Sequence, residues 1–239
     1  MADGRRQGVI ITGASSGIGA ALARHYAAQG AKLGLVARRA EPLERIAARL
    51  GNGALAYAAD VRDARAMRDA AADFMARHGC PEVVIANAGV SAGTLTEHAE
   101  DGAVFREIMD SNVLGMVNTF QPFVAAMRAA GRGALAGIAS VAGYRGLPGA
   151  AAYSASKAAA ISYLESLRVE LHASGVRVIT ICPGYVATPM TQHNPYPMPF
   201  IMRDDDAARK IADVIARGPS FAVMPWQMAL VARLLRAMP

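Results

Sequence analysis

Short apolar runs alternate with longer stretches of mixed polarity along the 239-residue chain. Each run is only a few residues long and is followed by glycine, proline or a polar residue, which is typical of a buried strand. The runs lie at residues 9–12, 33–37, 55–59, 83–86, 135–139, 176–181 and 221–223. The stretches between them are long enough for helices, so we predict one α/β domain over residues 1–239. It would hold about seven parallel strands, flanked by helices on both faces of a doubly wound sheet.

Some stretches fit this alternation less simply. Residues 103–130 carry one long helical pattern, whereas residues 91–100 are typical of an exposed loop. Residues 190–202 combine three prolines with methionines and aromatic residues, which fits neither a regular helix nor a strand. We predict a mobile apolar lid over a substrate at about residues 188–203, since loops at this edge of a sheet carry specificity. A surface loop packed on its own side chains is the alternative.

A glycine-rich turn follows the first apolar run and precedes a helical stretch. Its residues are Gly13, Ala14, Ser15, Ser16, Gly17, Ile18 and Gly19. Glycines let backbone N–H groups approach a pyrophosphate closely, and the N-terminus of the following helix adds partial positive charge. The spacing Gly-x-x-x-Gly-x-Gly differs from the Gly-x-Gly-x-x-Gly fingerprint, so the turn indicates a dinucleotide through this mechanism and not through the motif.

The second apolar run ends in Arg38 and Arg39, where an acidic residue would bind the adenosine ribose of NAD. Guanidinium groups instead form bidentate, charge-assisted hydrogen bonds to phosphate. We therefore predict NADP(H) as the cofactor, with NAD(H) less favoured. The alternative is that both arginines begin a solvated helix.

Polar residues also follow the third and fourth runs. Asp60 and Val61 end the third, where the carboxylate could accept a hydrogen bond from an adenine amino group. A helix N-cap before residues 63–78 is the competing interpretation of Asp60. The fourth run leads into Asn87, Ala88 and Gly89, which are small enough to let backbone pack against a flat cofactor.

Three residues further along combine into a proton-transfer device. Ser140 follows the fifth apolar run, at the strand end where ligands bind in open α/β sheets. Tyr153 and Lys157 are four residues apart, so on a helix both side chains leave the same face. An ammonium beside a phenol stabilises the phenolate and lowers its pKa toward neutrality. A solvated aromatic beside a solvated cation is the alternative.

The composition and net charge limit the kinds of partner that we expect the protein to bind. The net charge of +6 and pI near 9.7 raise the question of nucleic acid, but only three lysines occur and the arginines are scattered. We predict no nucleic-acid partner and take an anionic cofactor as sufficient. Cys80, Cys182 and the five histidines show no metal-ligand or disulfide spacing, so no metal is expected. The N-terminus lacks the apolar region of a signal peptide, which favours the cytosol.

The stretch at residues 226–238 predicts a terminal helix, which is too short and too rich in arginine to span a bilayer. We expect no transmembrane segment. This helix would pack against its own sheet or a neighbouring subunit, with a membrane surface as a further alternative.

Taken together, these residues resemble the short-chain dehydrogenase/reductase family. The resemblance covers about residues 8–189 and rests on Thr12-Gly13-x-x-x-Gly17-Ile18-Gly19, Asp60, Asn87-Ala88-Gly89, Asn112, Ser140, Tyr153-x-x-x-Lys157 and Pro183-Gly184. It implies a Rossmann-like domain, an oxidoreductase acting between alcohol and carbonyl, and a homodimer or homotetramer in which residues 103–130 and 152–173 pair across subunits.

The resemblance also implies roles for single residues. Tyr153 would be the catalytic acid/base, Ser140 would orient the carbonyl, and Lys157 would bond the nicotinamide ribose and lower the Tyr153 pKa. Asn112 would hold a water that links Lys157 to solvent, although a polar residue in a helix is usually a packing residue. Asp60 and Asn87 would hold the adenosine half. Cofactor contacts at the last strand would come from Pro183, Gly184, Val186 and, at the carboxamide, Thr188.

The substrate side is less defined by the sequence. Apolar residues of the lid, together with Tyr144, Leu147, Tyr185 and Met190 beside Ser140, favour a hydrophobic ketone or secondary alcohol. Sugar-like and acyl-carrier-bound substrates stay open. A non-catalytic NADP(H)-binding sensor or scaffold is the alternative function.

Overall fold

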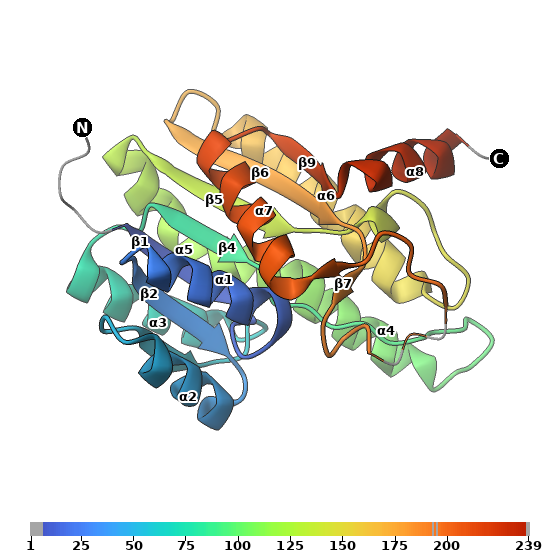
Figure 1. Cartoon of the computed structure of the whole chain (residues 1–239), viewed down its shortest axis with the longest axis horizontal. Coiled ribbons are helices and arrows are strands. Elements are labelled where there is room, and N and C mark those ends of the chain that lie inside the picture. The colour runs from blue at the N-terminus through green and yellow to red at the C-terminus, as the bar shows by residue number, and fades with distance from the viewer. Residues whose placement is uncertain (1–6, 193, 195, 238–239) are drawn as a thin grey trace.

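The seven long strands form one parallel sheet, in the order β3-β2-β1-β4-β5-β6-β9 (Figure 1). The computed structural model describes residues 7–192, 194 and 196–237. The strands are β1 (Gly8–Thr12), β2 (Lys32–Ala37), β3 (Leu55–Ala58), β4 (Val83–Ala86), β5 (Gly133–Ile138), β6 (Val176–Pro183) and β9 (Phe221–Met224). The chain moves outward from β1 to β3, then returns to place β4 on the other side of β1. The predicted doubly wound α/β fold is confirmed, and its switch point lies between β1 and β4.

Helices cover both faces of this sheet. They are α1 (Gly17–Ala28), α2 (Ala40–Leu50), α3 (Ala64–His78), α4 (Asp101–Met109), α5 (Gly115–Ala130), α6 (Ala151–Glu170), α7 (Asp204–Arg217) and α8 (Trp226–Ala237), with a 3₁₀ turn at Val141–Gly143. One apolar cluster joins α1, α2 and α7 to the sheet, and a second joins α3, α5 and α6. Strands that are covered on both faces need apolar residues at every position, which explains the continuous apolar runs.

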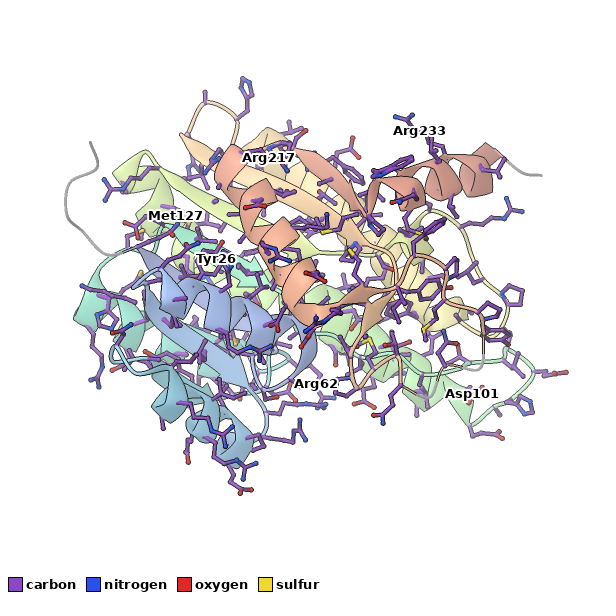
Figure 2. All side chains as sticks on the ribbon, viewed as in Figure 1. Tyr26, Arg62, Asp101, Met127, Arg217 and Arg233 are labelled. Carbon is purple, nitrogen blue, oxygen red and sulfur yellow. The ribbon has the colours of Figure 1, made fainter. Side chains whose placement is uncertain are left out.

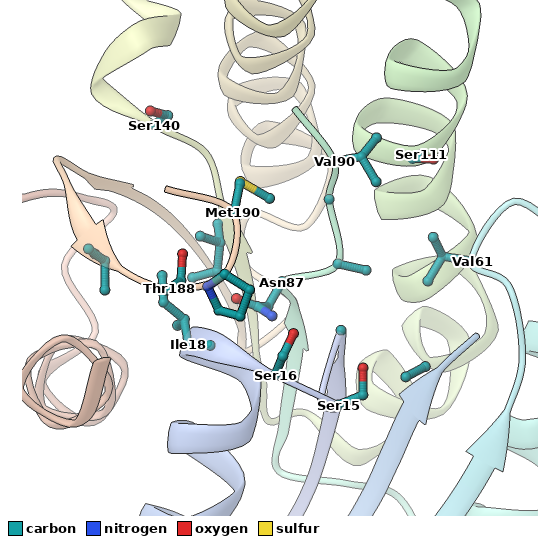
Figure 3. A pocket seen from close by; sticks show the side chains of 18 of the residues that line it. Ser15, Ser16, Ile18, Val61, Asn87, Val90, Ser111, Ser140, Thr188 and Met190 are labelled. Atoms are coloured by element: carbon teal, nitrogen blue, oxygen red, sulfur yellow. The ribbon is translucent and has the colours of Figure 1, made fainter. Parts of the chain in front are cut away.

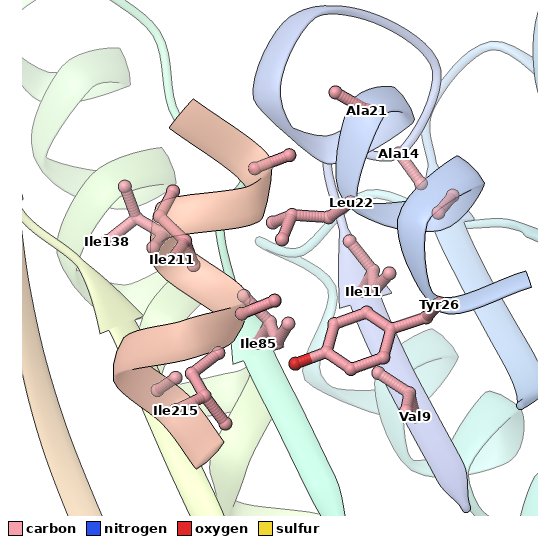
Figure 4. Packing of buried hydrophobic residues seen from close by; sticks show 14 of the residues in the cluster. Val9, Ile11, Ala14, Ala21, Leu22, Tyr26, Ile85, Ile138, Ile211 and Ile215 are labelled. Atoms are coloured by element: carbon pink, nitrogen blue, oxygen red, sulfur yellow. The ribbon is translucent and has the colours of Figure 1, made fainter. Parts of the chain in front are cut away.

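Alternate residues of each strand enter opposite clusters. Val9 and Ile11 of β1 pack under α1 and α7, whereas Ile10 packs with the other face. Figure 4 shows Leu22 and Tyr26 of α1 and Ile211 and Ile215 of α7 meeting over these strands. Full burial of one such aliphatic side chain stabilises a fold by about 1.5–3 kcal/mol. The two clusters thus hold the strand ends in place from both sides.

The predicted long helix at about residues 103–130 is confirmed. It runs without a break from Asp101 to Ala130, with a π-helical turn at Asp110–Leu114 between α4 and α5. Asn112 lies in this turn, and its side-chain amide bonds both backbone groups of Val90, on the segment that follows β4. Such turns frequently occur at functional sites.

The segment predicted as a lid, at about residues 188–203, is not irregular to its end. Met202–Arg203 form β8, which pairs in parallel with β7 (Val186–Ala187). The backbone N–H of Met202 also donates to the carbonyl of Tyr185 at 3.0 Å. Residues next to both ends of this segment are therefore paired with each other, whereas Met190, Phe200 and Ile201 within it are 45–49% exposed.

Helix α8 extends beyond the end of the sheet (Figure 1). Met228 and Ala232 are buried against Val141, whereas Trp226, Leu230 and Leu234 follow one another at four-residue intervals and are 57–69% exposed. Within the described residues, no helix is both long and apolar enough to cross a membrane.

The arginines are spread over the molecule. Figure 2 shows the labelled Arg62, Arg217 and Arg233 on three separate parts of the chain. Several others are paired with nearby acidic residues, as Arg24 is with Asp205 at 2.6 Å. This distribution agrees with the scattered positions in the sequence.

Candidate active site

A cavity of about 630 Å³ opens at the carboxyl ends of the central strands, beside the switch point. Figure 3 shows Ser16, Asn87, Thr188 and Met190 around the same opening, contributed by different segments of the chain. The predicted site residues that line the cavity are Gly13, Ser15, Ser16, Gly17, Ile18, Arg38, Arg39, Asp60, Val61, Asn87, Ala88, Gly89, Ser140, Tyr153, Lys157, Pro183, Gly184, Val186, Thr188 and Met190. The fold therefore brings together residues that are as much as 177 positions apart in the sequence, from Gly13 to Met190.

The other predicted site residues do not line this cavity. Gly19 and Asn112 lie directly behind its wall, as the contacts described below show. Tyr144 packs edge-on against Phe221, with ring centroids 6.2 Å apart, and belongs to the cluster under α8. Tyr185 and Leu147 are partly buried and are not among the residues that line the cavity. Substrate contacts by Tyr144, Leu147 and Tyr185 stay predictions.

Several lining residues were missed by the sequence analysis. They are Ala37, Ala59, Val90, Ser111, Ile138, Ala139, Pro189 and Thr191. Most of these residues are next in sequence to a predicted site residue. Their place at the end of a strand could have identified them. Thr191 gave a weaker signal, the hydroxyl three residues after Thr188. Its Oγ1 accepts from the Thr188 N–H at 3.1 Å and donates to the Val186 carbonyl at 2.7 Å, which shapes this edge of the cavity.

The glycine turn has the backbone that close phosphate approach requires. Gly13 and Gly17 adopt φ values of +68° and +51°, a region that side chains disfavour. A Cβ on Gly19 would overlap the Gly13 carbonyl and lie 2.7 Å from Asn87 Nδ2. The Ser16 side chain forms no capping hydrogen bond to α1, so the first N–H groups of that helix have no partner from the cap. This end of the cavity fits the pyrophosphate of a dinucleotide.

Thr12 and Asn87 lock the turn to the neighbouring strand. Thr12 is completely buried, and its hydroxyl accepts hydrogen bonds from the N–H groups of Asn87 and Ala88, each at 3.1 Å. Asn87 Nδ2 donates to the Thr12 carbonyl at 2.9 Å. The ends of β1 and β4 are therefore held at a fixed separation beneath the cavity.

Charged side chains crowd the cavity edge at β2 and β3. The Asp60 carboxylate accepts from the Arg62 N–H at 2.9 Å and from its guanidinium at 2.6 Å, which lowers the Asp60 pKa. Arg38 NH1 lies 3.6 Å from Glu107 Oε1, whereas Arg39 has no ion pair among the described residues. The competing N-cap role of Asp60 is excluded, because Asp63 caps α3 by accepting from the N–H groups two and three residues further on.

The opposite wall holds Tyr153 and Lys157, one turn apart on α6. Lys157 is only 5% exposed, and its Nζ donates to the Ile138 carbonyl at 2.9 Å. The same Nζ lies 5.6 Å from the centre of the Tyr153 ring. Ser140 begins the 3₁₀ turn after β5, where its Oγ accepts from the Ala142 N–H at 3.1 Å. A short turn and the start of a helix thus place all three groups at one wall.

Asn112 supports this wall from behind. It is 1% exposed, and its Oδ1 accepts from the Val90 N–H at 2.8 Å. Its Nδ2 donates to the Val90 carbonyl at 3.0 Å and to Ser156 Oγ at 2.9 Å. Because Ser156 precedes Lys157 on α6, Asn112 of the π-helical turn connects the segment after β4 to α6.

Burial governs the pKa values at this wall. It lowers the Lys157 pKa to about 8 and raises the Cys182 thiol pKa to about 12. Burial also raises the Tyr153 pKa, against the opposing effect of a hydrogen bond with Ser140. In this structure burial outweighs the pKa lowering that the sequence predicts for Tyr153. Among the described residues, no cluster of three or more His, Cys, Asp or Glu side chains is placed to hold a metal.

Known proteins share this arrangement. The family model for short chain dehydrogenase matches residues 7–197. An uncharacterised oxidoreductase of Myxococcus xanthus is 38% identical, covering 100% of this chain and 95% of that protein. The cis-4-hydroxycyclohexanecarboxylate dehydrogenase of Sinomonas cyclohexanicum is 34% identical, covering 90% of this chain and 91% of that protein.

Solved structures agree. A short chain dehydrogenase of Burkholderia cenocepacia in complex with NADP is 28% identical, with a TM-score of 0.85 over 98% of this chain and 94% of that one. A 3-ketoacyl-(acyl-carrier-protein) reductase of Brucella melitensis complexed with NADH is 26% identical, with a TM-score of 0.83 over 92% of this chain and 97% of that one. From the match of the family model and the similarity of these relatives over almost the whole chain, the chain belongs to the short-chain dehydrogenase/reductase family of NAD(P)(H)-binding enzymes.

Proposed function

We propose that this enzyme uses NADP(H) to interconvert a ketone and a secondary alcohol, on a hydrophobic substrate. The observation that carries the proposal is a single cavity with Ser140, Tyr153 and Lys157 at one wall and Arg38 and Arg39 at the other end. A proton-transfer group and a phosphate-binding edge on one cavity are what a dinucleotide-dependent reduction needs.

The cofactor, when bound, supplies the hydride. Tyr153 donates its proton to the carbonyl oxygen during reduction and removes it from the alcohol during oxidation. The Ser140 hydroxyl orients and polarises the same oxygen. Lys157 holds a positive charge beside the phenol, which favours the phenolate that forms when the proton leaves. Asn112 holds Val90 and Ser156 in register with this wall and would hold the water that links Lys157 to solvent.

The adenosine end of the cavity supports a preference for NADP(H). Arg38 and Arg39, not a carboxylate, directly follow β2, and both line the cavity there. Guanidinium groups bind phosphate in bidentate fashion, so a 2′-phosphate has two candidate partners. Asp60 would accept from the adenine amino group, and Asn87 would hold the neighbouring backbone.

The lid supports a hydrophobic substrate. Met190 lines the cavity, and Phe200 and Ile201 are about half exposed on the same segment. Apolar side chains without a covering partner are expected where a ligand completes the contact. The relative from Sinomonas cyclohexanicum is named for a secondary alcohol on a cyclohexane ring that also carries a carboxylate, so only the ring of that substrate is comparable with the one proposed.

We also propose a homodimer or homotetramer. The helices expected to pair across subunits expose Phe105, Leu114 and Val169, at 39%, 54% and 73%, and α8 exposes a further apolar face. Sedimentation of the purified protein tests this proposal, and a monomeric mass would refute it. The cytosolic location stays a prediction.

A fluorescence titration with NADPH and, in parallel, NADH tests the function first. Substituted cyclohexanones and linear hydrophobic ketones are then added to the preferred cofactor. Tight NADPH binding followed by its oxidation supports the proposal. Tight binding without turnover on any ketone or alcohol would favour the sensor or scaffold, and preference for NADH would refute NADP(H) as the proposed cofactor.

A further inference from the structure

Arg38 and Arg39 are neighbours in the sequence but have different surroundings. Arg38 NH1 lies 3.6 Å from Glu107 Oε1, on a helix that is remote in the sequence. Arg39 forms no ion pair among the described residues, although it lines the same cavity. Only one of the two guanidiniums is therefore drawn toward a carboxylate of the protein itself.

Glu107 also forms an ion pair with Arg62, a second cation at this edge of the cavity. Its Oε1 lies 3.9 Å from Arg62 NH1, and Arg62 in turn holds Asp60. Glu107 does not line the cavity, whereas Arg38 and Asp60 do. The Glu107 carboxylate therefore attracts the guanidiniums of Arg38 and Arg62 from outside the cavity.

We propose that Glu107 is a specificity-determining residue, which weakens selection of NADP(H) over NAD(H) by competing with the 2′-phosphate for Arg38. The inference rests on the proposed role of Arg38 as a phosphate-binding residue. A phosphate that approaches Arg38 must displace this carboxylate or share the guanidinium with it, and the two anions repel each other. NADH lacks the phosphate, so Glu107 leaves its affinity unchanged.

The geometry sets the size of the effect. The side chains of Arg38 and Glu107 are 53% and 49% exposed, and the 3.6 Å separation is that of an ion pair without a short hydrogen bond. Exposed pairs of this kind are weak and are screened by salt. Release of Arg38 should therefore raise NADPH affinity by about two- to fivefold at low ionic strength, and by less in high salt.

The test compares Glu107→Gln with wild type in binding of NADPH, NADH and the fragment 2′,5′-ADP, which needs no catalysis. We expect about two- to fivefold tighter binding of NADPH and 2′,5′-ADP, with NADH unchanged. Glu44→Gln is the matched control, because Glu44 is an exposed glutamate on α2 without an ion pair among the described residues. It removes the same charge and should leave the NADPH-to-NADH affinity ratio unchanged.

A double-mutant cycle makes the contact itself measurable. The gain from Glu107→Gln should vanish in an Arg38→Gln background and persist in an Arg39→Gln background. An unchanged ratio in Glu107→Gln would overturn the inference, as would a lower ratio, since Glu107 would then position Arg38 for the phosphate.

The two proposals fail separately. Wild-type preference for NADPH without any effect of Glu107→Gln leaves the proposed function standing and refutes the role of Glu107. Wild-type preference for NADH refutes the proposed cofactor. A selective gain for NADPH in Glu107→Gln would, even then, support competition at Arg38.

Discussion

Lys157 and Arg38 are cations that line the same cavity, yet one is buried and the other is half exposed. Lys157 is 5% exposed and donates to a backbone carbonyl that no other side chain shares in the described structure. The Arg38 side chain is 53% exposed and faces a carboxylate at 3.6 Å. Burial lowers the pKa of Lys157 to about 8.

The difference in burial between Lys157 and Arg38 predicts that substitutions at the two ends of the cavity will differ in effect. At the buried wall Lys157 and Asn112 are held by hydrogen bonds to Ile138, Val90 and Ser156, so loss of one group leaves a buried partner unpaired. At the exposed edge water replaces a lost partner at little cost. Substitutions at the wall should therefore have large effects, and those at the edge should have graded ones.

The largest effect is expected from Tyr153→Phe. The substitution keeps the ring and removes the proton donor, so kcat should fall by about 10²–10⁴-fold, which is the usual contribution of general acid catalysis. NADPH affinity should change little. Steady-state kinetics on the preferred ketone, with a parallel cofactor titration, measure both. Near-normal turnover would show that Tyr153 is not the acid/base.

Gly19→Ala should come next. The added Cβ would overlap the Gly13 carbonyl and crowd Asn87 Nδ2. Overpacking of this kind costs about 1–3 kcal/mol, so we expect a lower midpoint in urea and weaker cofactor binding. Gly102→Ala is the control, because Gly102 lies near the start of α4 with no atom within 4 Å of an added Cβ. Equal effects of the two substitutions would contradict this account of the glycine turn.

Lys157→Met should alter how stability depends on pH. The folded Lys157 pKa of about 8 lies below the ordinary 10.5, so the unfolded chain binds more protons between these values. Wild-type stability therefore rises through this window, and the variant lacks this rise. From pH 7 to pH 9 the free energy of unfolding of the wild type, relative to that of Lys157→Met, should rise by about 1 kcal/mol.

Urea unfolding at pH 7, 8 and 9 measures this change. The window lies below the raised pKa values of Tyr153 and Cys182, which face the same ammonium. Lys210→Met, at an exposed position on α7, provides the control. A pH-independent difference between wild type and Lys157→Met would mean that Lys157 titrates near its ordinary value.

The smallest effect is expected from Arg62→Gln at the exposed edge. Its guanidinium pairs with Asp60 at 2.6 Å, but both side chains contact solvent. The free energy of unfolding should fall by less than about 1 kcal/mol, and the loss should shrink in 1 M salt. Arg68→Gln, on the exposed face of α3, is the comparison. A loss above about 2 kcal/mol would place Arg62 with the buried wall.

The sequence was sufficient to predict most of the fold, because buried strands are visible in the sequence as local runs of apolar residues. Strands covered on both faces appear as continuous apolar runs, and the helices between them need their own minimum length. The same runs located the strand ends, so Gly13, Asn87 and Ser140 could be assigned to one edge before any contact was known. Helical spacing placed Tyr153 and Lys157 on one face of a helix, whereas their catalytic roles came from the family resemblance and stay predictions.

The features that the sequence did not predict involve partners that are distant in the chain. The π-helical turn contains Asn112, whose side chain bonds Val90, and β8 is formed by the pairing of Met202 with Val186. Asp63, and not Asp60, caps α3, because Arg62 folds back on Asp60. Tyr144 and Tyr185 lie outside the cavity although they adjoin residues that line it.

By itself, the sequence determined which segments are buried, which strand ends meet and which side chains share a helix face, because these depend on residue type and short periodic spacing. Only the tertiary structure decided which of two adjacent arginines is paired, how the segment predicted as a lid is held at both ends and in which direction burial shifts the pKa of Lys157. Those properties depend on distance, exposure and local solvent, which arise only when remote segments are packed together.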